Sequence, residues 1–104
     1  MSKRLAYLEK VTSEGSKDPF AWYGLANEYS NLGRPDEALA TFEKLRALDA
    51  SYVPQYLMCG QMLVNQKRPA EARVWLEQGI SMAQKVGNTH ALSELQNVLA
   101  SIED

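Results

Sequence analysis

The sequence predicts an all-α protein of about six helices, stacked as antiparallel helix pairs. The first observation behind this prediction is an internal sequence repeat. Residues 31–43 and 65–77 agree at several spaced positions at an offset of 34. The identical pairs are Asn31 and Asn65, Arg34 and Arg68, Pro35 and Pro69, Glu37 and Glu71, Ala38 and Ala72, and Glu43 and Glu77. A period of this length is typical of stacked repeats, whose units cannot bury their apolar faces alone. The second observation is that proline and glycine interrupt segments of helical periodicity at regular places.

The spaced residues of the first unit match a known repeat pattern. They are Trp22, Leu25, Ala26 and Tyr29, followed by Gly33, Ala38 and Phe42. The chain therefore resembles the tetratricopeptide repeat family, whose pattern is W-x-x-L-G-x-x-Y followed by Gly, Ala and Phe. The resemblance implies a right-handed solenoid of helix pairs. It covers one repeat, residues 19–52, well, and a second, residues 53–86, less well, because Tyr56, Leu63 and Lys67 depart from the pattern.

The first segment, residues 3–14, is expected to form one helix. Leu5, Leu8 and Val11 lie at helical spacing, and Gly15 follows as a break. One period earlier than the first repeat, this segment aligns with the second helix of a unit. It therefore corresponds to an N-terminal half repeat.

Each full repeat is expected to contain two helices. In the first repeat, Asp18 and Pro19 provide an N-cap and a first helical residue, Gly33 can end the helix in the left-handed conformation, and Pro35 starts the second helix to about residue 48. Pro54 and Pro69 start the corresponding helices of the second repeat.

Two tryptophans call for different interpretations. Trp22 occupies the core position of the family's pattern, so we expect it to be mostly buried. Trp75 has Thr41 as its counterpart one repeat earlier, and we expect a contact at the surface or between repeats.

The last segment, residues 88–102, is expected to be a capping helix, which completes a single domain over residues 1–104. Its apolar residues fall on one arc of the helical wheel: Ala91, Leu92, Leu95, Val98, Leu99 and Ile102. Polar residues cover the opposite side, as a terminal cap requires.

Composition excludes several classes of partner. The net charge of −2 comes from interspersed acids and bases, which gives no basic stripe for nucleic acid or for anionic lipid. One histidine and one cysteine exclude a metal site built from several imidazole or thiolate ligands. A single cysteine also allows no internal disulfide, which favours a cytoplasmic location. We expect no cofactor, no metal, no nucleic acid partner and no membrane partner.

Residues for catalysis are also missing from the sequence. Cys59 stands where Leu25 stands one repeat earlier, which indicates a small buried side chain and not a reactive thiol. His90 follows an N-cap and is expected to be solvated. No nucleophile, acid and base can be assembled from the pattern, so we expect that the protein is not an enzyme.

The resemblance implies a binding surface, because the first helices of successive tetratricopeptide repeats line a concave groove for a peptide or helix. The candidate groove residues at the matching positions are Phe20, Tyr23, Asn27, Asn31, Leu57, Gln61, Val64, Asn65 and Leu95. Amides among them can bond an extended backbone, and apolar side chains can hold those of a peptide. The predicted function is a non-catalytic scaffold that binds another protein.

Other readings stay open at this point. The candidate positions could be ordinary solvated surface on a short stack. The chain could also be a self-associating structural unit, or an accessory subunit of a larger complex, because about three repeats are commonly needed for a stable stack. The polar back of the last helix favours a monomer over a homodimer.

Overall fold

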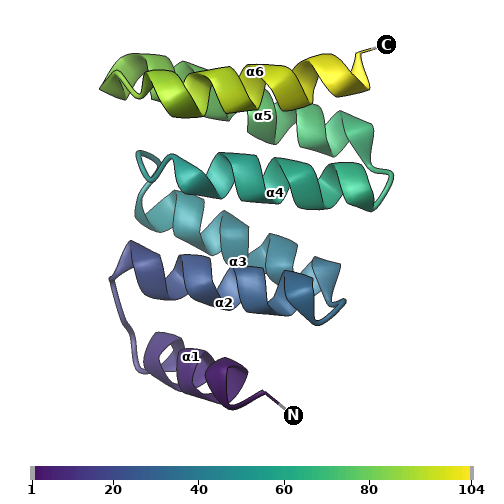
Figure 1. Cartoon of the computed structure of the whole chain (residues 1–104). Coiled ribbons are helices and arrows are strands. Elements are labelled where there is room, and N and C mark those ends of the chain that lie inside the picture. Colours follow the sequence, from purple (N-terminus) through teal and green to yellow (C-terminus); the bar gives the residue numbers. More distant parts are fainter. Residues whose placement is uncertain (1, 104) are drawn as a thin grey trace. The chain divides into compact units, whose positions relative to one another are not determined.

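The computed structural model describes residues 2–103, so the two ends of the predicted domain, residues 1 and 104, lie outside the described residues. The described part is helical and contains no strand. It divides into two compact units, residues 2–50 and residues 51–103 (Figure 1). The first unit contains α1 (Lys3–Ser13), α2 (Pro19–Asn31) and α3 (Pro35–Leu48). The second contains α4 (Pro54–Asn65), α5 (Pro69–Val86) and α6 (Thr89–Ile102).

The turns of the first unit follow from its cap residues. The Asp18 carboxylate accepts a hydrogen bond from the backbone N–H of Phe20 at 3.0 Å, which caps α2 ahead of Pro19. After α2, Gly33 adopts a positive φ of 73°, and the N–H of Arg34 donates to the carbonyl of Tyr29 at 2.9 Å. This turn reverses the chain into α3.

The core of the first unit lies where α2 packs against α1 and α3. Its small residues, Ala26 and Ala38, are fully buried, as are Phe42 and Leu45. Leu8 of α1 covers the other side of α2 at 7% exposure. The two alanines allow the backbones of α2 and α3 to approach closely.

The second unit repeats this design with different residues. Lys67 holds a positive φ of 59° where the first repeat has Gly33, and the N–H of Arg68 again donates to the carbonyl of Leu63, at 2.9 Å. A lysine in the left-handed region costs about 1 kcal/mol, so the turn is held by the helices around it. Gly60 leaves room for Leu76, because a Cβ on Gly60 would lie 2.6 Å from Leu76 Cδ2.

One of the predicted groove residues, Leu95, is placed wrongly by the sequence. It is fully buried in the second unit. The reason is Gly79, which stands where the first repeat has Leu45 and leaves space that Leu95 fills from α6; a Cβ on Gly79 would lie 2.9 Å from Leu95 Cδ2. The wheel of the capping helix, which put Leu95 on the inward face, is the correct description.

Of the two positions expected for Trp75, at the surface or between repeats, the surface position is wrong. Its side chain is 4% exposed, and its ring lies 6.0 Å from that of Tyr56, centroid to centroid. Burial of the indole compensates for the smaller ring of Tyr56 at the position of Trp22.

Candidate interaction surfaces

The predicted residues of α2 lie on a side of the helix that is uncovered within its unit. Phe20 is 63% exposed and Asn31 is exposed, whereas Tyr23 and Asn27 are partly buried. The Oδ1 atom of Asn27 is enclosed, and no group of the described residues donates a hydrogen bond to it. An enclosed oxygen without a donor is unfavourable, but a partner's donor cannot reach this atom while it stays enclosed.

The predicted residues of α4 have a similar character. Gln61 and Asn65 are exposed, and Leu57 and Val64 are partly buried. Amides and aliphatic side chains therefore alternate along this side of α4, which we call the α4 face. The corresponding side of α2, with Phe20, Tyr23, Asn27 and Asn31, is the α2 face.

A groove that the sequence did not predict runs between α1 and α2. It has a volume of about 410 Å³. Its walls are mainly apolar, and we call it the α1–α2 groove; it is lined by Arg4, Tyr7, Leu8, Val11, Ser16, Asp18, Phe20, Ala21 and Gly24. Tyr7, which is 66% exposed, is not among the residues predicted from the sequence. The signal that could have indicated it is the repeat period, which aligns it with Thr41 and Trp75.

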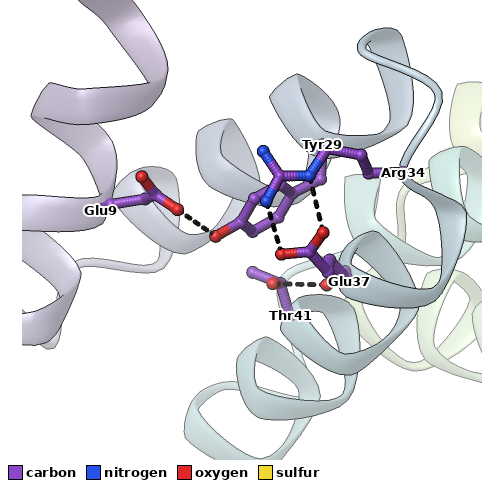
Figure 2. Close-up of polar contacts among 5 residues, drawn as sticks. All are labelled: Glu9, Tyr29, Arg34, Glu37 and Thr41. Atoms are coloured by element: carbon purple, nitrogen blue, oxygen red, sulfur yellow. Dashed lines mark hydrogen bonds and ion pairs between the residues drawn. The ribbon is translucent and has the colours of Figure 1, made fainter.

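A second hollow of the first unit, of about 470 Å³, is bordered by a polar network (Figure 2). The Tyr29 hydroxyl donates to the Glu9 carboxylate at 2.6 Å and joins α2 to α1. The Arg34 guanidinium lies 4.8 Å from the centre of the Tyr29 ring and donates twice to Glu37, at 2.6 and 2.7 Å. Thr41 donates to the backbone carbonyl of Glu37 at 2.8 Å. The polar groups of this network therefore have a structural role in the first unit.

The network has a measurable electrostatic consequence. Burial and the hydrogen bond to Glu9 raise the pKa of Tyr29 from 10.0 to about 12, because both oppose formation of a phenolate. The folded-state pKa is therefore above the unfolded value. The stability that Tyr29 contributes through this shift is fully present below pH 10 and is lost as the pH rises through about 12.

Replacing Glu9 by glutamine should therefore move the pKa of Tyr29 down toward its ordinary value. The substitution removes the carboxylate charge and leaves only an uncharged amide oxygen to accept from the Tyr29 hydroxyl, and it keeps the burial of the ring. An ultraviolet absorbance titration of tyrosine ionisation measures this shift, with Tyr29→Phe identifying the highest component. An identical titration of the Glu9→Gln variant and the original chain would refute the assignment.

Over residues 2–103, no three His, Cys, Asp or Glu side chains gather in a way that could hold a metal ion. Among the helices of that same range, none combines the length and apolar character that a bilayer span needs. Cys59 is buried, as its repeat position predicts.

Comparison with known proteins identifies the family. The tetratricopeptide repeat family is matched by residues 19–52 and again by residues 57–86. The chain belongs to the tetratricopeptide repeat family. The all-α fold class expected from the sequence is thereby confirmed, and tetratricopeptide repeats are typically protein-interaction modules without catalysis.

Solved structures agree with this assignment. A tetratricopeptide repeat domain protein of Salinibacter ruber is 36% identical, with a TM-score of 0.75 over 83% of this chain and 97% of that one. A Bordetella parapertussis protein is 25% identical, with a TM-score of 0.83 over 99% of this chain and 90% of that one. The type III secretion translocator chaperone SycD of Yersinia enterocolitica shares the fold at 15% identity, with a TM-score of 0.85 over 95% of this chain and 69% of that one. Curated protein sequences gave no significant match.

Proposed function

We propose that this tetratricopeptide protein binds extended or helical segments of another protein through two surfaces, the α2 face of the first unit and the α4 face of the second unit. The observation that carries the proposal is the exposure of Phe20, 63%, on a helix whose opposite side is buried. An exposed aromatic ring beside Tyr23 and Asn27 is the composition that protein-binding surfaces favour. The α4 face adds Leu57 and Val64 as apolar contacts.

Specificity on these two faces would come from the amides. The exposed amides, Asn31 on α2 and Gln61 and Asn65 on α4, can donate to and accept from a peptide backbone. None of the predicted residues of either face carries a charge. A partner segment with apolar anchors and an uncharged centre therefore fits better than a strongly acidic or basic one.

We also propose a role, an oligomeric state and a location for the protein. The chain acts as a non-catalytic scaffold, as a monomer that needs no cofactor. A cytoplasmic location belongs to the same proposal, because a single cysteine permits no internal disulfide.

Changing Tyr23 and Leu57 together to glutamate should reduce partner recovery at least about tenfold, because interface energy is concentrated in a few apolar anchors. Both side chains are only partly buried, so the helices should remain folded. Affinity capture from cells of the source organism, quantified by mass spectrometry, measures the effect. Circular dichroism of each variant checks the fold.

The matched control places the same two charges on the second helices. Leu48 and Val74 are 41% and 48% exposed, and they lie on α3 and α5. The Leu48→Glu and Val74→Glu pair should leave recovery unchanged. Loss of the partner in the control pair, with full recovery in the Tyr23 and Leu57 pair, would place binding on the second helices and sink the proposal.

A further inference from the structure

Three helices of the chain occupy the same place in the repeat. At the 34-residue period, Leu8 of α1 aligns with Phe42 of α3 and Leu76 of α5. The residue before each of them is Tyr7, Thr41 and Trp75. All three are second helices of a repeat, so the same positions should face a first helix in each case.

Two of these second helices are covered in that way. Phe42 is fully buried in the unit in which α3 packs on α2. Leu76 is fully buried at the point where Gly60 of α4 leaves room for it, and the Trp75 ring packs against Tyr56 of the same helix. In the second unit, α4 contacts both α5 and the helix that follows it, α6.

Within residues 2–103, no first helix covers this side of the remaining second helix, α1. It packs on the helix that follows it, α2, as α5 packs on α6 (Figure 1). Tyr7 is 66% exposed, whereas its counterpart Trp75 is 4% exposed. The α1–α2 groove lies at these positions, since Arg4, Tyr7, Leu8 and Val11 line it.

We propose that the α1–α2 groove binds an amphipathic helix of a partner protein, which takes the place beside α1 that α4 takes beside α5. The chain itself supplies the template for this helix. It should carry an aromatic residue against Tyr7 and, one turn later, a small residue over Leu8, as Tyr56 and Gly60 do in α4.

The charge of the groove refines this partner. Arg4 stands where α3 and α5 have Ala38 and Ala72, both fully buried. Its side chain is 63% exposed and reaches Glu28 at 3.3 Å. A helix seated in the groove would meet this guanidinium, so an acidic residue on the helix opposite Arg4 is favoured. This surface goes beyond the α2 and α4 faces, because α1 contributes half of it.

A peptide copied from α4 tests the proposal in trans. The probe is a fluorescein-labelled peptide with the sequence of residues 51–68, with Cys59 replaced by alanine, and binding to the full chain is followed by fluorescence anisotropy. We expect saturable binding with a Kd on the order of 100 µM, because an isolated short helix must first be ordered. The Tyr7→Glu and Tyr7→Ala variants should each weaken binding at least about fivefold.

Two matched controls test where on the chain the peptide helix binds. A peptide with Gly60→Leu forms a better helix, yet it should bind at least about tenfold more weakly, because its side chain would occupy the space needed by Leu8. The Leu48→Glu and Leu57→Glu variants of the chain should bind the probe normally. Loss of probe binding in Leu57→Glu alone would assign the peptide to the α4 face and overturn this proposal while supporting the previous one.

Other results would also contradict it. Undiminished binding to both Tyr7 variants, or no binding to the original chain, would show that the groove does not accept a helix of this kind. Light scattering tests whether the groove instead binds a second copy of the chain. A dimer that Tyr7→Glu dissociates would mean that the groove is a homodimer interface and not a partner site.

Discussion

Gly79→Ala should lower the free energy of unfolding by about 3 kcal/mol, although alanine is the better helix former. A Cβ at this position would lie 2.4 Å from Cβ of Tyr56 and 2.9 Å from Cδ2 of Leu95. The first of these atoms is attached directly to the backbone of α4 and cannot move without moving that helix. Urea denaturation followed by circular dichroism gives the free energy of unfolding.

The matched control is Gly24→Ala in α2, which makes the same chemical change in a helix interior. A Cβ on Gly24 would lie 3.4 Å from its nearest neighbours, Arg4 and Leu8, which is ordinary van der Waals contact. Alanine should therefore raise stability by about 0.5 to 1 kcal/mol through helix propensity. Equal effects of the two substitutions would show that Gly79 is not a close-packing position.

Trp75→Ala should cost about 4 kcal/mol, as removal of a large buried aromatic side chain does. Its indole is 4% exposed and packs on Tyr56, so the substitution leaves a cavity inside the second unit. The decrease in the free energy of unfolding, obtained from the midpoint and slope of urea denaturation, measures this cost.

Trp22→Ala provides the comparison, because the two tryptophans occupy different repeat positions. Trp22 is only partly buried, and its Nε1 donates to the carbonyl of Ser16 at 2.7 Å. Its removal should cost about 2 kcal/mol, less than that of Trp75. A larger loss at Trp22 than at Trp75 would contradict the burial pattern.

The helix boundaries follow closely from the sequence, because local chemistry decides them. Asp18 with Pro19, Gly33 with Pro35, and Asn88 each act within a few residues of their own position. The small residues at repeat positions, such as Ala26 and Gly60, lie at close helix crossings.

Side chains whose burial depends on a distant partner were less predictable. Leu95 looked like a groove residue because the cap helix was aligned by the 34-residue period alone, whereas Gly79 draws it into the core. Trp75 could not be placed because its burial depends on Tyr56 of another helix. Tyr7 was missed because exposure results from the absence of a covering helix, which no local pattern reports.

The most similar part of the repeat, from Arg34 to Ala38 and from Arg68 to Ala72, differs only at Asp36 and Ala70 and has a structural role. In both units the arginine donates to a glutamate three residues later, and this contact stabilises the turn before the second helix. These hydrogen bonds lower the pKa values of Glu37 and Glu71. The positions that differ between repeats, such as Tyr23 and Leu57, are the ones that we propose define the partner.

Binding of partner proteins to the faces of the first helices, α2 and α4, can be mapped by nuclear magnetic resonance of the isotope-labelled chain, with and without the captured partner. We expect the largest amide and side-chain shifts at Phe20, Tyr23 and Asn27 on α2 and at Leu57 and Gln61 on α4. Shifts confined to α3 and α5, with these residues unchanged, would contradict it.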